Sequence, residues 1–455
     1  MLWQLSMTVD RDVLIVGAGI SGLYAARLLR KAGLSVGVLE ARDRVGGRVL
    51  SKQLPDGNTV DLGAQWISPQ QKRIWALTEE FGLKKVETNT QGKAVVQVRG
   101  RFLQMSGNMP PLSWFGLFDA WQLSWRIRRL SKQVSIDAPW QHQQADRLDS
   151  VSFDLWLKQH SISGEGYDYW HHIVTSGMCA DTSSFSPLEV IHQIASMGGL
   201  DALEDADNHL LEQGAQTIAK LLAEELEDCV HLNSAVRSLR LAGQVVRVTT
   251  DEGDFYGKRI ILALPPQLVS RISFDQTMLN STQQKNRDWV LGKVIKNVIV
   301  YDQPWWRSDG FSGVADTPTE PIDFLADSST EESHLGVLVA FASGPNAIEM
   351  SQMDGDTRKA TVLAHIQKVF GKSSAEPVHF LSMDWITEPY SCGGYASRRP
   401  VGGWTEYNSL LTDFHSPVHL AGTETATVWR SYMEGALQSA ERASTEILSA
   451  INKHQ

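Results

Sequence analysis

The chain has few cysteines, no long apolar run and no excess of positive charge. Its three cysteines, Cys179, Cys229 and Cys392, are odd in number and far apart, so we predict no disulfide framework and expect a reducing compartment. No stretch approaches the roughly 18 apolar residues of a membrane span. Asp and Glu (52) outnumber Lys and Arg (42), and no basic cluster stands out, so we expect no nucleic-acid partner. We also find no spaced metal-ligand cluster and no local motif of a Ser-His-Asp triad.

The remaining composition is that of a soluble globular protein, with 42% apolar and 21% charged residues. A length of 455 residues exceeds one ordinary domain, so we expect two domains. The first predicted strand begins at Asp12, which leaves no room for the apolar region of a signal peptide. We therefore expect a soluble, cytoplasmic protein without a membrane partner.

The most informative segment runs from Asp12 to Arg48. Its apolar pattern predicts a strand at Asp12–Val16, a helix at Ile20–Lys31 and a second strand at Leu34–Leu39. Three glycines with G-x-G-x-x-G spacing separate the first strand from the helix: Gly17, Gly19 and Gly22. A strand, these glycines and a helix in this order are typical of dinucleotide-binding βαβ units.

Each part of this motif has a physical role. Gly17 permits a sharp turn, Gly19 permits close approach of the backbone to a pyrophosphate, and Gly22 permits tight packing of helix on strand. The helix N-terminus offers free N–H groups to phosphate. Glu40, at the end of the second strand, can accept hydrogen bonds from both ribose hydroxyls, which argues against NADP.

The segments that follow favour FAD over NAD. Arg44–Arg48 contains two glycines between two arginines, and Asp61–Trp66 adds a second loop of small residues. An extended FAD needs such loops beyond its pyrophosphate, whereas NAD does not. Arg48 can pair with pyrophosphate oxygens, and Gly63 and Ala64 can admit the flavin ring. The alternative is that both arginines are solvated loop charges.

Four further motifs resemble those of the flavin-dependent amine oxidases of the monoamine oxidase type. They are Leu291–Lys296, Pro304–Arg307, the segment from Trp385 to Tyr395, and Ala421–Ala436. They occur in the order found in that family, and the resemblance covers nearly the whole chain. The bacterial flavin monoamine oxidases and cyclic-amine oxidases are the members that it resembles most.

The resemblance implies an α/β fold, α+β overall, in two domains. A Rossmann-like, discontinuous FAD-binding domain is expected from residues 11–86, 208–283 and 392–450. Residues 87–207 and 284–391 are expected to form a substrate domain of helices and a mixed sheet. Its many tryptophans are expected to lie mostly in the core: Trp114, Trp121, Trp125, Trp140, Trp156 and Trp170.

The resemblance also implies three catalytic residues. Tyr395 and Tyr432 match the two aromatic residues that flank the substrate at the flavin. Lys296 matches the lysine that assists reoxidation of the flavin by O2. Strand alternation in Val294–Tyr301 places Lys296 on one face with Val294 and Val298, and Lys293 is a competing candidate on the other face.

The family's flavin-contacting positions map onto a larger set of residues. This set is Gly17, Gly19, Ile20, Ser21, Gly22, Glu40, Ala41, Arg42, Gly47, Arg48, Gly63, Ala64, Gln65, Trp66, Val236, Ala263, Trp385, Gly422, Thr423, Glu424 and Met433. Several members of the family bind the flavin covalently through a cysteine directly before the position of Tyr395. This chain has Gly394 at that position. We therefore predict non-covalent FAD, with Cys392 a bystander.

The resemblance implies hydride transfer from an amine to flavin N5, release of an imine, and reoxidation by O2 to give H2O2. Phe341 and His172 are expected in the substrate cavity, although His172 can equally be a core histidine. Arg430 either binds a substrate carboxylate or lies on the surface. The alternatives are an L-amino acid oxidase, an amine dehydrogenase with a protein acceptor, or a flavin scaffold without turnover. A homodimer is also expected from the family.

Overall fold

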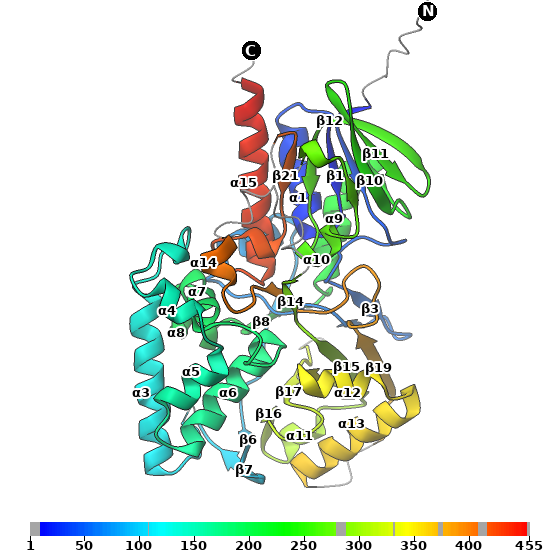
Figure 1. The fold of residues 1–455 in the computed structure, drawn as a ribbon. Helices are drawn as coiled ribbons and strands as arrows, with labels where there is room; N and C mark the ends of the chain where they lie inside the picture. The colour runs from blue at the N-terminus through cyan, green and yellow to red at the C-terminus, as the bar shows by residue number, and fades with distance from the viewer. Residues whose placement is uncertain are drawn as a thin grey trace, which may run out of the picture.

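The computed structural model describes residues 10–107, 109–278, 288–330, 333–371, 376–407 and 416–452. Two large sheets organise the molecule, one in the upper half and one in the lower half of Figure 1. The upper sheet has eight strands and the lower has seven. This architecture confirms the predicted α/β class with a Rossmann-like sheet and a second, mixed sheet.

The upper sheet has the order β13-β10-β11-β12-β1-β2-β9, and β21 pairs with β12. Its strands come from three distant parts of the chain: β1 (Arg11–Val16), β2 (Val36–Leu39), β9 (Val230–His231), β10 (Val236–Ala242), β11 (Val245–Thr250), β12 (Gly253–Leu262), β13 (Ser273–Phe274) and β21 (Val418–Leu420). The parallel neighbours of β1 are β2 and β12. β12 is long enough to pair with β11 through its first half and with β21 through its second half.

Alternation along β1 divides its side chains between two cores. Val13 and Ile15 face helices, whereas Leu14 and Val16 face the β10–β11 side. The helices on the first face are α1 (Ile20–Lys31), α2 (Lys72–Glu80), α9 (Gln216–Leu226) and α15 (Met433–Asn452). Helix α15 lies along α1, so the two ends of the chain form one layer (Figure 1).

The lower sheet has the order β19-β15-β18-β17-β16-β6-β7 and is mixed, because β6 and β16 are parallel and the other pairs antiparallel. Its strands are β6 (Lys93–Val98), β7 (Arg101–Met105), β15 (Val294–Tyr301), β16 (Phe311–Asp316), β17 (Phe324–Asp327), β18 (Gly336–Ser343) and β19 (His379–Asp384). Helices α12 (Pro345–Ser351) and α13 (Gly355–Phe370) cover one face. The face that carries Lys296 packs instead against residues 50–66, which lie between β2 and α2.

Helices α3 to α8 form a separate layer beside this sheet (Figure 1). They are α3 (Trp114–Ser131), α4 (Ala145–Asp149), α5 (Phe153–His160), α6 (Gly164–Met178), α7 (Pro187–Ser196) and α8 (Leu200–Glu204). The expectation that the tryptophans lie mostly in the core is wrong for half of them. Trp156 and Trp170 are buried, but Trp114, Trp121 and Trp125 are 86, 63 and 51% exposed.

Short elements connect these layers: β3 (Ser51–Gln53), β4 (Thr59–Asp61), β5 (Lys85–Glu87), β8 (His209–Leu211), α10 (Pro266–Val269), β14 (Val290–Leu291), α11 (Trp305–Ser308), β20 (Ser397–Arg398) and α14 (Gly403–Tyr407). The predicted domain boundary at residues 283 and 284 lies outside the described residues. The domain limits stay a prediction.

Candidate active site

The three glycines of the βαβ unit have distinct surroundings. Gly17 has φ +105°, and a Cβ there would lie 2.8 Å from the carbonyl oxygen of Ala263. A Cβ on Gly22 would lie 2.0 Å from the carbonyl oxygen of Gly17, which no side chain tolerates. A Cβ on Gly19 meets nothing within 4 Å, and its φ of −70° suits any residue. The surrounding protein therefore allows only glycine at positions 17 and 22, whereas Gly19 leaves the approach to the N-terminus of α1 open. We call the loop from Gly17 to Gly19 and the N-terminus of α1 the cradle.

Glu40 closes the strand side of this cradle. Its carboxylate accepts a hydrogen bond from the backbone N–H of Ala18 at 2.8 Å and is buried. Arg42 donates to the same carboxylate at 3.2 Å, to Glu388 and, at 2.8 Å, to Ser391. Arg42 thus holds the chain that leads to Tyr395 against the end of β2.

Arg48 does not lie free in solvent. Its guanidinium makes a bidentate pair with the buried carboxylate of Glu424, at 2.6 and 3.0 Å, and donates to the carbonyl of Tyr395 at 2.9 Å. Arg44 donates to backbone carbonyls of its own loop, including Gly47 at 3.1 Å. The alternative of two solvated loop charges is therefore wrong.

The C-terminal motif joins the cradle through backbone and hydroxyl contacts. The N–H of Gly422 donates to the hydroxyls of Ser21 and Ser439, at 3.0 and 2.9 Å. The hydroxyl of Thr423 donates to the carbonyl of Tyr432 at 2.9 Å. Thr423 and the neighbouring Glu424 therefore connect the segments that carry Tyr432 and Tyr395 to the start of α1.

Lys296 is buried in the centre of β15, with 1% of its surface exposed. Its Nζ donates to the carbonyl of Gly63 at 2.9 Å and to the side-chain oxygen of Gln65. Burial lowers the pKa of Lys296 to about 7, although the charge of Asp61 opposes this change. Lys293 lies before the strand, and its Nζ reaches the carbonyl of Cys392 at 3.4 Å. Lys296 is therefore the lysine that faces the segment from Gly63 to Gln65.

Four aromatic rings lie beside Lys296, and we call them the aromatic row: Phe324, Phe341, Trp66 and Tyr395. Phe341 lies opposite Lys296 on β18, and Phe324 lies opposite Phe341 on β17. Trp66 packs on Phe341 with ring centroids 5.9 Å apart, and Tyr395 meets Phe341 edge-on at 6.2 Å. Lys296 Nζ lies 5.5 Å from the centroid of Phe341.

Two buried donors in this region have no partner within the described protein: the side-chain Nε2 of Gln65 and the indole Nε1 of Trp66. A buried donor without a partner is costly, so both suit a polar ligand. Trp385, the expected neighbour of the flavin, donates instead to the carbonyl of Leu62 at 3.0 Å. The open cradle at Gly19 and these donors next to Lys296 fit a cofactor that extends from α1 to the aromatic row.

Tyr432 packs edge-on against Trp429, with centroids 5.1 Å apart. Arg430 between them is 1% exposed and pairs with the fully buried Glu189 at 2.5 Å, so its interpretation as a surface arginine is wrong. Burial raises the pKa of Glu189, but the charges of Arg430 and Arg398 outweigh it and hold the pKa below its ordinary value. The guanidinium of Arg430 is thus already matched by a carboxylate.

Arg398 was not anticipated from the sequence. It is 1% exposed, and its Nη1 donates to Ser431 at 2.6 Å and to Gln193 at 3.1 Å. Its Nε has no partner within the described protein. Burial, with the nearby charge of Arg430, lowers the pKa of Arg398 to about 10.

His172 lies at the far side of the aromatic row and is half-buried. Its Nε2 is 3.4 Å from Asp316. Burial raises the pKa of the neighbouring Asp323 to about 6, and the charge of His172 opposes this. The backbone N–H of Asp323 donates to the carbonyl of Phe341 at 3.0 Å, which places this acid beside the row. No spacing in the sequence distinguishes Asp323 from a loop aspartate.

The other predicted contact residues lie in several different elements of the fold. A Cβ on Gly394 would lie 2.9 Å from Cγ1 of Val294, so a side chain at the position before Tyr395 would require Val294 to shift. Ala64 is exposed, Val236 begins β10, and Met433 begins α15. The carbonyl of Ala263 packs closely against Gly17. Their contacts with FAD stay predictions.

The described residues include neither a candidate metal site nor a candidate membrane-spanning helix. No group of three or more His, Cys, Asp or Glu side chains there is placed to hold a metal ion. No helix in that part of the chain is long and apolar enough to cross a membrane.

The fold and the site define a flavoprotein oxidoreductase: a dinucleotide cradle whose far end meets a buried lysine among aromatic rings. Residues 20–448 match the family described as flavin-containing amine oxidoreductases, and the chain belongs to that family. It is an FAD-dependent enzyme of amine oxidation, as the four motifs predicted.

Relatives cover nearly the full chain. The putative flavin-containing monoamine oxidase of Mycobacterium tuberculosis is 33% identical over 97% of both chains. The L-amino acid dehydrogenase of Synechocystis is 31% identical over 97% of this chain and 95% of its own. Among solved structures, putrescine oxidase bound to putrescine has a TM-score of 0.91 at 34% identity, over 96% of this chain and 99% of its own. Cyclohexylamine oxidase of Brevibacterium oxydans has a TM-score of 0.90 at 26% identity, over 97% and 100%.

Proposed function

We propose that the protein oxidises a primary or secondary amine to an imine, with O2 as electron acceptor and H2O2 as product. FAD, when bound, supplies the chemistry: it takes a hydride from the carbon next to the amine nitrogen and is reoxidised by O2. Water then hydrolyses the imine to an aldehyde or ketone. The observation that carries the proposal is the buried Lys296, which donates to Gly63 and Gln65 beside the aromatic row.

The residues of the site have to present an uncharged amine, because a protonated nitrogen cannot assist cleavage of the neighbouring C–H bond. Aromatic rings attract cations, but they also exclude water. Exclusion of water lowers the pKa of an amine, as burial does for Lys296 itself. Tyr395 and Tyr432 are proposed to flank the substrate and to orient its C–H bond.

The aromatic row also bears on the substrate. Trp66, Phe324 and Phe341 pack ring against ring beside Lys296. Two of the similar structures are a putrescine oxidase bound to putrescine and a cyclohexylamine oxidase. We propose an amine with an apolar ring or chain, because such a group gains most from contact with these rings.

An anaerobic titration tests this function. The purified holoprotein is mixed with aliphatic, aromatic and cyclic amines, polyamines and L-amino acids, and bleaching of the flavin absorbance is followed. O2 is then admitted and H2O2 is assayed. We expect bleaching by apolar amines and rapid formation of H2O2. Absence of bleaching by every amine contradicts the proposal and favours a flavin scaffold without turnover.

Oxidation of an L-amino acid is a second candidate, and Arg398 is the observation that favours it. This guanidinium is buried beside Ser431, and its Nε lacks a partner, as expected of a group that receives a carboxylate. Bleaching by L-amino acids but not by the matching amines assigns this activity. If amines bleach the flavin but no H2O2 forms after O2 is admitted, and an electron-accepting dye is reduced, the protein is an amine dehydrogenase.

We further propose that FAD is held without a covalent bond. Gly394 has no side chain to attach, and Cys392 accepts a hydrogen bond from Arg271 at 3.0 Å and donates to the carbonyl of Pro389. Acid precipitation is expected to leave a colourless pellet and a yellow supernatant. A pellet that retains the flavin contradicts non-covalent attachment, and its loss in Cys392→Ser then identifies the attached residue.

A further inference from the structure

The outer side of helix α3 carries a continuous stripe of exposed aromatic side chains. Four of them follow at intervals of four, three and four residues, which places them on one side of an α-helix: Trp114, Phe118, Trp121 and Trp125. They are 51 to 86% exposed, and Phe115 beside them is 58% exposed. The other side of α3 packs into the helical core. An exposed aromatic patch of this size marks an interaction surface.

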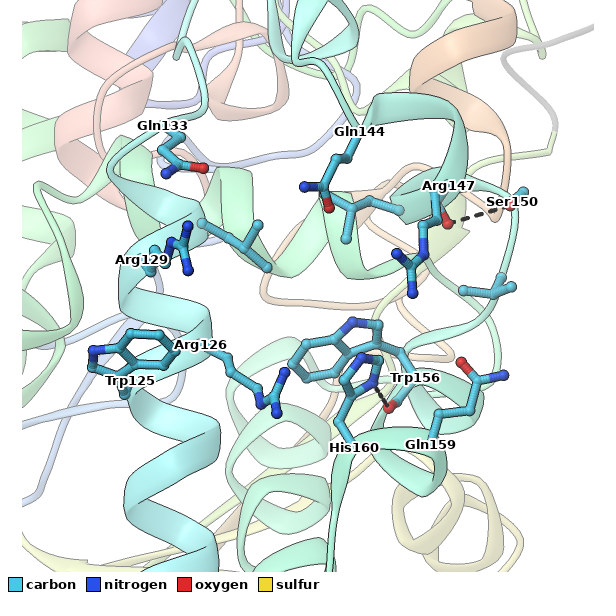
Figure 2. A pocket seen from close by; sticks show the side chains of 13 residues that line it. Trp125, Arg126, Arg129, Gln133, Gln144, Arg147, Ser150, Trp156, Gln159 and His160 are labelled. Carbon is cyan, nitrogen blue, oxygen red and sulfur yellow. Dashed lines mark hydrogen bonds between the residues drawn. The ribbon is translucent and has the colours of Figure 1, made fainter.

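A cavity of about 550 Å³ opens at the C-terminal end of this aromatic stripe, between α3, α4 and α5. Three arginines contribute to its wall: Arg126, Arg129 and Arg147. Figure 2 shows the guanidinium groups of Arg126 and Arg147 reaching into the space in front of Trp156. Arg129 lies over the ring of Trp125, 5.6 Å from its centroid. Trp125 also lines the cavity, so the stripe and the cavity form one surface.

The cavity offers its arginines no carboxylate. No acidic residue lines it, and no ion pair joins the three arginines to a carboxylate in the described parts of the chain. Arg128, the next residue along the exposed side of α3, already holds the exposed Asp201 in an ion pair at 2.6 Å. Asp119, the acidic residue of α3 itself, is buried and accepts hydrogen bonds from the backbone N–H groups of Ile162 and Ser163. In a second copy of this surface both carboxylates are therefore already engaged.

We propose that the α3 surface docks on a lipid bilayer that contains anionic phospholipid. Tryptophan and phenylalanine side chains insert at the boundary between headgroups and acyl chains, and a helix with such a face lies flat on the membrane. The arginine cavity receives a phosphate of the headgroup, since guanidinium groups form paired hydrogen bonds with phosphate oxygens. Helix α3 lies at the outer edge of the molecule (Figure 1). This contact is peripheral, and it departs from the prediction of no membrane partner.

Co-sedimentation of the holoenzyme with vesicles tests the proposal. Vesicles of phosphatidylcholine alone are compared with vesicles that also contain phosphatidylglycerol. The two test variants are Trp121→Ser/Trp125→Ser in the stripe and Arg126→Gln/Arg147→Gln in the cavity. Ile348→Ser is the control, because Ile348 is a 47% exposed apolar residue on the distant helix α12. Amine oxidation in the absence of vesicles should be unchanged in all three, which verifies their folding.

We expect binding to the anionic vesicles only, at least tenfold weaker in both test variants, unchanged in the control, and reduced by salt. Equal binding to both vesicle types, or no binding, overturns the proposal. Light scattering tests whether the surface binds a second copy of the chain instead. If the protein binds no vesicles, and the molar mass of Trp121→Ser/Trp125→Ser is half that of the wild type, the surface is a dimer interface. Inorganic phosphate can also be tested as a thermal stabiliser of the protein. If it stabilises the wild type but not Arg126→Gln/Arg147→Gln, and no vesicles are bound, the cavity binds a soluble anion and the membrane proposal is overturned.

Discussion

Replacement of Lys296 by methionine is expected to slow reoxidation of the reduced enzyme by O2 about 100-fold, the size expected for loss of one preorganised electrostatic group. Lys296 is almost fully buried, so its positive charge is poorly screened and stabilises the negative charge that develops on O2. Methionine has a similar length and suits an apolar site, so FAD should stay bound. Stopped-flow mixing of the reduced variant with O2 measures the rate.

The pH dependence of the same reaction gives an independent check. Because the pKa of Lys296 is about 7, the charged form predominates below this pH and the neutral form above it. Reoxidation of the wild type should therefore slow as the pH rises through about 7, and Lys296→Met should lose this step. Lys293→Met is the control, since the amine of Lys293 lies before the strand and donates to the carbonyl of Cys392 at 3.4 Å. An unchanged rate in Lys296→Met would remove the proposed role.

Substitution of Gly19 by valine is expected to weaken FAD binding about 100-fold or more, without unfolding the protein. The φ of Gly19 is ordinary, and a Cβ there meets no protein atom within 4 Å. The new side chain therefore projects into the approach to the N-terminus of α1, where the pyrophosphate needs the backbone N–H groups. Titration of the apoprotein with FAD, followed by flavin fluorescence, measures the affinity.

Two other glycine variants bracket this result. Gly355→Val has equal free space, but on α13, so it should bind FAD normally. Gly22→Ala forces a Cβ to within 2.0 Å of the carbonyl oxygen of Gly17, so it should lower the thermal stability as well as the affinity. Normal FAD affinity in Gly19→Val would place the pyrophosphate elsewhere.

Local patterns predicted the elements around the cradle and Lys296 because both signals are short-range. The helix at Ile20–Lys31 has the predicted bounds, since an apolar periodicity of 3.6 lies between a glycine turn and a second strand. Strand alternation placed Lys296 with Val294 and Val298, and these valines do share one core cluster.

Contacts between residues that are far apart in the chain could not be predicted from the sequence. Nothing near Arg430 identifies Glu189 as its partner, because 241 residues separate them. Nor does composition reveal that Trp114, Trp121 and Trp125 face outwards, since the same periodicity describes a helix whose aromatic side is buried. The union of β6 and β7 with strands near residue 300 likewise depends on pairing between distant segments.

The Arg430–Glu189 pair constrains the redesign of this enzyme. Helix α7 holds the segment before Tyr432 at three points: Glu189 binds Arg430, Gln193 binds the carbonyl of Arg430 at 2.6 Å, and the carbonyl of Ser196 accepts the N–H of Trp429 at 2.8 Å. Loss of one partner of a buried ion pair costs about 3–5 kcal/mol. Mutant libraries that aim to change substrate preference through α7 should therefore vary Glu189 and Arg430 together or leave both unchanged.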